Sequence, residues 1–286
     1  MAVAQKQELQ ARAVNDRDLI AAFLRTDRLY AAYPLGDLDG PGRRRVAWGM
    51  SFDASGQAIA LGMHHEGLVP QPLFLMGDVD GCRAILAGVL KPRDAYFQTS
   101  ALHEPAIREL YELEPPLAML RMAVDRGTFV PFAGPAERLD ATDIEELNRL
   151  YQLGFRSGFP VSVVEEGIYY GVRVRGHLVA AAGTHVMSSR EQIAVVGNVM
   201  TQPEYRGHDF AKMVTSAVTA ELLARVSDVT LNVHADNAPA IAAYDRLGYR
   251  VYSHLVERLG RRRSGGWGLM RPIREAIRLT WPRDSR

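Results

Sequence analysis

An internal repeat constrains the fold of this chain more than any other feature. A shift of 134 residues places residues 95–113 on residues 229–247 without a gap. Within this match, Pro105-Ala106-Ile107 falls on Pro239-Ala240-Ile241. The elements expected around these segments also follow one order in both halves: hairpin, strand, helix, strand, helix, strand. We therefore predict two copies of one unit, because similarity at a fixed spacing indicates a repeated structure.

The element pattern predicts an α/β (α+β) protein whose two units each hold a mixed, mostly antiparallel sheet flanked by helices. Residues 130–135 contain two prolines and a glycine, which is typical of a linker. The expected organisation is residues 1–129, residues 136–258 and a tail, residues 259–286. Further expected elements are a hairpin at 45–52 and 57–64, helices at 103–113, 142–153, 207–224 and 237–247, and strands at 168–174, 177–186, 193–201, 229–234 and 250–257.

Composition excludes several classes of protein. A net charge of +1 over 286 residues argues against a nucleic-acid binder with a strongly basic surface. The single cysteine, Cys82, excludes an internal disulfide framework and a zinc site made of several cysteines. We expect no signal peptide and no transmembrane segment, because neither a cleavable leader nor a long apolar run is present. We also expect no metal site. The expected location is cytoplasmic.

The C-terminal segment is basic. Residues 261–286 carry eight arginines against Glu275 and Asp284, a net of +6, so the remaining chain is near −5. If residues 271–281 are helical, one side is apolar and the other carries arginines. A helix docked on the acidic body is the simplest interpretation. Binding to an anionic membrane or nucleic acid, a subunit contact and disorder remain alternatives.

Two motifs between residues 193 and 249 carry the chemical information. An apolar strand ends in Asn198-Val199-Met200-Thr201, and a helix is expected soon after it. The first motif lies at the start of this helix and reads Arg206-Gly207-His208-Asp209-Phe210-Ala211. The second motif comprises Asn237, Ala240, Tyr244, Gly248 and Tyr249. In both order and spacing, residues 137–257 resemble the GNAT superfamily of acyl-CoA-dependent N-acyltransferases.

The resemblance implies transfer of an acyl group, most simply acetyl, from acyl-CoA to an amine, by direct attack in a ternary complex. It implies that the strand before the first motif splays from its neighbour and that its backbone binds the pantetheine arm and polarises the thioester. Tyr244 would be the general acid that protonates the departing thiolate. The resemblance makes Asn198 a second catalytic candidate. The implied cofactor-binding residues are Val199, Met200, Thr201, Arg206, Gly207, His208, Asp209, Phe210, Ala211, Asn232, Asn237 and Ala240.

Physical reasoning supports a phosphate site at the first motif independently. The first N–H groups of a helix lack internal partners and carry partial positive charge, which attracts a diphosphate. Glycine lets phosphate approach the backbone, and Arg206 adds a charge-assisted contact. Asp209 departs from the family pattern, which has glycine there, and a carboxylate repels phosphate. We expect Asp209 to turn away and cap an N–H of the first turn.

Several assignments stay open from sequence. His185 and Glu204 are candidates for the general base, and the residues Phe155, Phe159 and Tyr169 either shape the acceptor pocket or belong to the core. The first copy has an acidic loop at residues 77–81 and leucine in place of Tyr244, so we predict that it is degenerate and non-catalytic. The acceptor is expected to be a small-molecule amine, and a homodimer is left open. A CoA-binding regulatory module without turnover is the alternative function.

Overall fold

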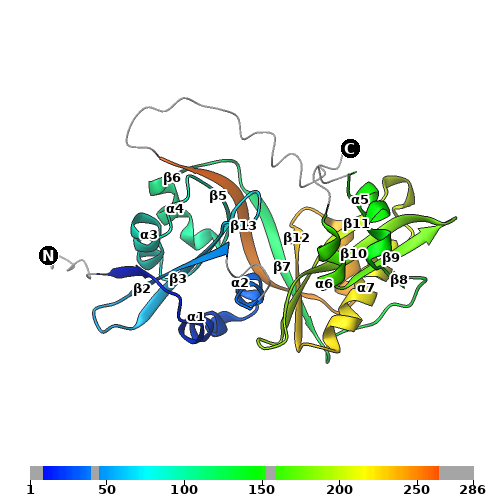
Figure 1. The fold of residues 1–286 in the computed structure, drawn as a ribbon, viewed down its shortest axis with the longest axis horizontal. Coiled ribbons are helices and arrows are strands. Elements are labelled where there is room, and N and C mark those ends of the chain that lie inside the picture. Colours follow the sequence, from blue (N-terminus) through cyan, green and yellow to red (C-terminus); the bar gives the residue numbers. More distant parts are fainter. Residues whose placement is uncertain (1–8, 40–44, 153–158, 264–286) are drawn as a thin grey trace. The chain divides into compact units, whose positions relative to one another are not determined.

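The computed structural model describes residues 9–39, 45–152 and 159–263. These residues form two compact units, of which the first takes residues up to 119 and from 254 onward, and the second takes residues 120–253 (Figure 1). The mixed α/β architecture with mostly antiparallel strands is the predicted fold class. Most of the predicted tail, residues 264–286, lies outside the described residues.

The first unit is a sheet of six strands in the order β1-β2-β3-β4-β5-β13, with the short β6 paired to β13. Strands β4 and β5 pair in parallel, whereas the pairs β1–β2, β2–β3, β3–β4 and β5–β13 are antiparallel. Its elements are β1 (Gln10–Ala13), α1 (Arg17–Leu24), α2 (Ala32–Asp37), β2 (Val46–Phe52), β3 (Ala58–His65), β4 (Pro72–Gly77), α3 (Val79–Gly88), β5 (Asp94–Thr99), α4 (Glu104–Leu110), β6 (Tyr111–Leu113) and most of β13 (Arg250–Arg262).

The second unit is a sheet in the order β7-β12-β11-β10-β9-β8. Strands β11 and β12 run parallel, and β10 is antiparallel to both β11 and β9. Its elements are most of β7 (Leu117–Asp125), β8 (Glu137–Arg138), α5 (Ile144–Gln152), α6 (Val161–Glu166), β9 (Tyr169–Val174), β10 (His177–Ser188), β11 (Ile193–Thr201), α7 (Phe210–Leu223), β12 (Asp228–His234), α8 (Ala238–Arg246) and the start of β13.

The expected hairpin turns have the required backbone. Arg175 and Gly176 join β9 to β10 with φ values of 53° and 82°. Two consecutive positive φ angles define the tight turn that suits the twist of an antiparallel pair. In the first unit, the Asp53 carboxylate accepts hydrogen bonds from the N–H groups of Ser55 and Gln57, both at 2.9 Å. Local sequence therefore fixes both hairpins.

Helices cover both faces of the second sheet. Val214, Val218 and Leu222 of α7 are fully buried in the same cluster as Ala180 and Ala182 of β10. Ala181, between those two alanines, belongs instead to the cluster that contains Leu147 and Leu150 of α5. Successive side chains of a strand point to opposite faces, so α7 and α5 pack on opposite sides.

The repeat is visible in the element boundaries. Strands β5 and β12 begin at Asp94 and Asp228, and helices α4 and α8 begin at Glu104 and Ala238, so both pairs differ by 134 residues. In each copy, a long strand follows: β7 after α4, and β13 after α8. Strand β7 lies next to β12 in the second sheet, whereas β13 (Figure 1, orange) pairs with β5 in the first. The two copies thus exchange equivalent strands.

This exchange moves the division between units away from the expected linker. Residues 130–135 lie within the second unit, where Val130 N–H donates to the Leu247 carbonyl at 3.0 Å and Phe132 N–H donates to Ser216 Oγ at 2.8 Å. At the other end, residues 259–262, expected in the tail, complete β13. Arg261 there pairs with Asp94 of β5 at 2.7 Å.

Other boundaries also differ from expectation. The helix predicted over residues 103–113 ends at Leu110, because the three residues after it form β6 against β13. The helix predicted from residue 207 begins at Phe210, since Gly207 and Asp209 have positive φ angles. Sequence analysis did not predict helices α2 and α6. Helix α2 contains a proline and a glycine, and α6 contains three valines, all residues that disfavour a helix. Across the described residues, none of the helices combines the length and apolar character needed to cross a membrane.

Candidate functional site

The parallel strands β11 and β12 separate part-way along their length. Paired residues run from Ile193 with Asp228 to Val196 with Leu231. Strand β11 continues to Thr201 and β12 continues to His234 beyond the last pair. On its β12 side, the outer part of β11 therefore has an opening in place of strand pairing, while its other edge stays paired with β10 at Met200 and Thr201. The end of pairing between β11 and β12 corresponds to the splay that the resemblance implies.

A bulge accompanies the opening. Asn198 has a φ of 53°, in the left-handed region, and the register between β10 and β11 shifts between the pairs Gly183–Gly197 and Ala181–Met200. Such irregularities break the pairing of a strand and redirect its side chains. Met200 packs into the α5 cluster, whereas Val199 packs against the α7 cluster. Among the described residues, buried Thr201 Oγ1 has no hydrogen-bond partner.

The start of α7 presents free backbone donors. Its first helical hydrogen bond runs from Met213 N–H to the Asp209 carbonyl at 3.0 Å. The N–H groups of residues 210–212 therefore have no acceptor within the helix. Gly207, with a φ of 82°, has open space where a Cβ would lie. The ring of His208 stacks on Phe210 with centroids 5.7 Å apart. This helix end has the geometry of an anion site.

Asp209 behaves differently from the expectation that it would cap the helix. Its side chain makes no capping hydrogen bond. The carboxylate instead pairs with Lys212 Nζ at 3.0 Å. Lys212 is buried and its ammonium lies 3.8 Å from the centroid of the Phe132 ring, a cation–π contact. A cation one turn along the helix therefore holds and partly neutralises this carboxylate. Sequence spacing of three residues was the signal that could have revealed this pair.

Tyr244 lies in the same apolar cluster as three other predicted site residues, Val199, Phe210 and Ala240. Its side chain is buried, and burial raises its pKa above the ordinary value of 10. The phenol is therefore protonated at neutral pH, as a proton donor must be. Asn237 is the N-cap of α8, where its Oδ1 accepts from Ala240 N–H at 3.2 Å. The second motif thus positions Tyr244 through a capped helix.

Asn232 has a partner that sequence analysis missed. Its Oδ1 accepts from Nε of Arg121 at 2.9 Å. Arg121 is only 3% exposed and comes from β7, next to β12 in the sheet. An arginine inside an otherwise apolar strand was the available signal, because a buried guanidinium needs acceptors.

Asn198 joins three neighbouring strands through its side chain. Its Nδ2 donates to the Tyr169 hydroxyl on β9 at 2.9 Å, and its Oδ1 lies 2.9 Å from Nε2 of His185 on β10. Its carbonyl accepts from the Tyr151 hydroxyl of α5 at 2.6 Å. Phe159 packs on the Tyr151 ring with centroids 5.0 Å apart, whereas Phe155 lies outside the described residues. The other candidate base, Glu204, lies exposed on the turn before α7.

Comparisons with known proteins agree with this geometry. A family model described as FR47-like protein matches residues 156–258. A GNAT-family protein from Novosphingobium aromaticivorans is similar at 25% identity, with a TM-score of 0.52, over 67% of this chain and 84% of that one. The chain has the GNAT fold. No curated protein matches it at a significant level.

Two further GNAT structures show the extent of the shared fold. A GCN5-related N-acetyltransferase from Kribbella flavida has a TM-score of 0.59 at 17% identity, over 82% of this chain and 94% of that one. A tandem GNAT protein from the clavulanic acid biosynthesis pathway has a TM-score of 0.53 at 12% identity, over 88% of this chain and 98% of that one. At these identities the likeness concerns the fold alone.

In the first unit, a side chain bridges the two strands, β4 and β5, that correspond to β11 and β12. Pairing of β4 with β5 ends at Phe74 with Gln98. Beyond it, the buried hydroxyl of Tyr30 donates to the Leu75 carbonyl at 2.8 Å and accepts from Ser100 N–H at 2.9 Å. One side chain therefore bridges the ends of both strands and fills the space between them.

The helix start in the first unit is also occupied. The Asp78 carboxylate caps α3 and accepts from Gly81 N–H at 2.8 Å. A carboxylate at this position takes up a donor that would otherwise face an anion, and it repels phosphate. The two features that form the opening and the anion site in the second unit are thus filled by protein groups in the first.

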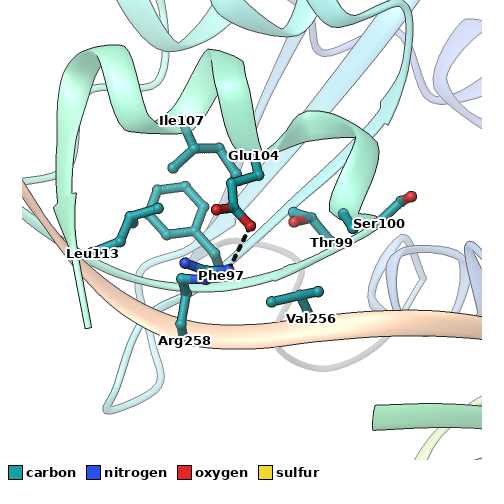
Figure 2. A pocket seen from close by; sticks show the side chains of 9 residues that line it. Phe97, Thr99, Ser100, Glu104, Ile107, Leu113, Val256 and Arg258 are labelled. Atoms are coloured by element: carbon teal, nitrogen blue, oxygen red, sulfur yellow. Dashed lines mark hydrogen bonds and ion pairs between the residues drawn. The ribbon is translucent and has the colours of Figure 1, made fainter. Parts of the chain in front are cut away.

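The first unit retains a small cavity between β5, α4 and β13 (Figure 2). Glu104 and Arg258 face each other across it, with Oε2 and Nη2 2.6 Å apart. Its volume is about 10 Å³, which matches a single water molecule. A cavity of this size is too small for a pantetheine arm or an amine substrate. Within the described residues, no group of three or more potential metal ligands occurs.

Proposed function

We propose that this chain with the GNAT fold is an N-acyltransferase that moves an acetyl group from acetyl-CoA to an amine. The observation that carries the proposal is the opening between β11 and β12 together with the unfilled N–H groups at the start of α7. A pantetheine arm needs backbone donors and acceptors along an extended groove, and a diphosphate needs a helix start. Support comes from the second unit, where the unpaired end of β11 is followed within ten residues by the start of α7.

The residues at this opening fit acyl-CoA as a co-substrate. Arg206 and the N–H groups of residues 207–211 would hold the diphosphate. The backbone of residues 199–201 would hold the pantetheine arm, and the unpartnered Thr201 Oγ1 offers another hydrogen-bonding group there. Asn237 would contact the pantetheine or phosphate portion with the amide nitrogen that its capping bond leaves available. We assign Asn232 and Ala240 to the wall of the same groove.

The proposed reaction is a direct attack within a ternary complex. The neutral amine attacks the thioester carbon, and backbone N–H groups of β11 stabilise the negative charge that develops on the carbonyl oxygen. The C–S bond then breaks, and the thiolate takes the phenolic proton of Tyr244. The amide nitrogen loses its extra proton to the phenolate, which restores Tyr244. The products are the N-acetylated amine and CoA with its thiol protonated.

We propose that the second unit alone is catalytic and that the first is a degenerate copy. Tyr30 fills the strand opening of the first unit, and Asp78 occupies its helix start. The expected acceptor is a small-molecule amine, and the expected location is cytoplasmic. We propose no nucleic-acid partner. A homodimer would be compatible with the same site.

Calorimetric titration with acetyl-CoA should give one binding site per chain, because Tyr30 bridges the strand ends of the first unit and Asp78 caps its helix start. Release of free thiol from acetyl-CoA, followed with a chromogenic thiol reagent, should then require an amine from a broad panel. Arg206→Ala should weaken binding about tenfold, since it removes a charge-assisted contact. Two equivalent sites per chain would contradict the degenerate first unit. Tight binding without thiol release on any amine would instead support a regulatory module.

Replacing Asp209 by glycine should tighten acetyl-CoA binding about fivefold. Glycine adopts the observed φ of 61° without strain, and the change removes a negative charge beside the proposed diphosphate site. The change also frees the Lys212 ammonium from its ion pair. Calorimetry at two salt concentrations measures the effect, which should shrink as salt rises. Asp209→Asn is the matched control, because it removes the charge but keeps the size. Weaker binding by both variants would contradict this electrostatic account.

A further inference from the structure

Two facing glycines make room for the aromatic rings that hold Asn198. Gly183 of β10 and Gly197 of β11 are paired residues. A Cβ on Gly183 would lie 2.1 Å from the Tyr169 ring, and a Cβ on Gly197 would lie 2.2 Å from the His185 ring. No side chain fits at such distances, so both rings lie flat over backbone. Glycine at both positions therefore leaves the space above the sheet that the Tyr169 and His185 rings occupy next to Asn198.

The hydrogen-bond pattern defines which nitrogen of His185 is basic. Asn198 Nδ2 donates to Tyr169, so its Oδ1 is the acceptor that faces His185. The His185 Nε2 must then carry a hydrogen, and in the neutral ring Nδ1 is the unprotonated nitrogen. Asn198 and Tyr169 thereby fix both the tautomer and the ring orientation, the arrangement commonly used to prepare a histidine for proton transfer.

The His185 side chain is exposed to solvent, and its surroundings favour the neutral imidazole. The residue is exposed to solvent, unlike fully buried Tyr169. Protein crowded around the ring nevertheless disfavours its charged form and lowers its pKa below 6.5, against the opposing effect of the hydrogen bond to Asn198. Near neutral pH the ring is therefore able to accept a proton. Glu204 lies exposed on the turn before α7, two residues ahead of Arg206 of the proposed phosphate site, so we do not assign it this task.

We propose that His185 is the general base that deprotonates the acceptor ammonium, and that Asn198 and Tyr169 are its positioning residues. This inference rests on the proposed acyl transfer and places the amine beside β10, next to the thioester held by residues 199–201. One proton moves from the ammonium to Nδ1, which leaves a neutral amine with a lone pair for attack. The imidazolium then returns that proton to solvent, to which the residue is exposed.

His185→Gln is the direct test, measured as thiol release from acetyl-CoA with the amine that gives the fastest wild-type rate. We expect kcat/KM to fall about 100-fold, the usual contribution of a general base. The wild-type rate should rise with pH through the titration of His185, and this limb should be absent from the variant. Acetyl-CoA affinity by calorimetry should stay unchanged. His177→Gln is the matched control, because His177 is an exposed histidine at the start of the same strand.

Tyr169→Phe provides a second, independent test that keeps the imidazole. It removes the hydroxyl to which Asn198 donates, so we expect a threefold to tenfold fall in kcat and a displaced pH limb. Full activity and an unaltered pH limb in His185→Gln would overturn the inference while the proposed function stands. If His185→Gln proves unfolded by circular dichroism, an unaltered pH limb in Tyr169→Phe overturns it instead. Wild-type protein that releases no thiol with any amine overturns the proposed function and this inference together.

Discussion

Tyr244→Phe should lower kcat by roughly 100-fold or more, with little change in the affinity for acetyl-CoA. The phenol is the proposed donor to the departing thiolate, and burial keeps it protonated because it raises its pKa. Phenylalanine preserves the ring in the apolar cluster against which Val199 and Phe210 pack, but it removes the hydroxyl proton. Steady-state thiol release between pH 6 and about 9, together with calorimetry for acetyl-CoA, separates the catalytic effect from a binding effect.

Tyr249→Phe is the matched control for this prediction. The Tyr249 ring lies 6.1 Å from the Tyr244 ring in the same cluster, but its hydroxyl is bonded to Thr219 Oγ1 at 2.7 Å. Loss of this hydroxyl should cost about 1 kcal/mol of stability and leave kcat within about threefold of wild type. Equal activity of Tyr244→Phe and wild type across the pH range would remove the acid role from Tyr244.

Gly248→Ala should destabilise the second unit by about 3–5 kcal/mol. Gly248 has a φ of 91°, and a Cβ there would lie 1.9 Å from the carbonyl oxygen of Thr128. That oxygen belongs to the backbone, so it cannot swing aside as a flexible side chain would. Urea unfolding followed by circular dichroism and tyrosine fluorescence measures the loss as a lower transition midpoint.

Gly176→Ala separates backbone strain from the steric clash. Gly176 has a φ of 82° in the β9–β10 turn, but nothing lies within 4 Å of a Cβ there. Only the left-handed conformation should then cost free energy, about 1–2 kcal/mol. If both alanine variants lose the same stability, the contact between Gly248 and Thr128 is not the cause of the larger loss.

Local pattern was sufficient to predict most elements of the second unit. The strand before the first motif, the helix after it and the helix bearing Tyr244 all occur within a few residues of expectation. These elements follow from apolar periodicity, caps and turn residues, which act over short distances. The repeat of 134 residues also aligns the starts of β5 with β12 and of α4 with α8.

Strand neighbours and hydrogen-bond partners that lie far apart in the sequence could not be predicted. Periodicity can indicate that a segment such as β7 or β13 is a strand, but it carries no information about which sheet the strand joins. The bond from Arg121 to Asn232 depends on that choice, because Arg121 belongs to β7. The Asp209–Lys212 pair was missed for another reason: a carboxylate at a helix start has two competing partners, the backbone and a nearby cation. The two glycines beneath Tyr169 and His185 became interpretable only once their pairing was known.

The exchanged strands give a structural reason to keep a first unit for which we propose no ligand. Strand β7 is encoded in the first copy yet forms the border of the second sheet, and it delivers the arginine that engages Asn232. Deleting the first copy would remove β7 from the second sheet, and deleting the second copy would remove β13 from the first sheet. The proposed reaction centre would therefore depend on both halves of the chain, although we place its residues in only one of them.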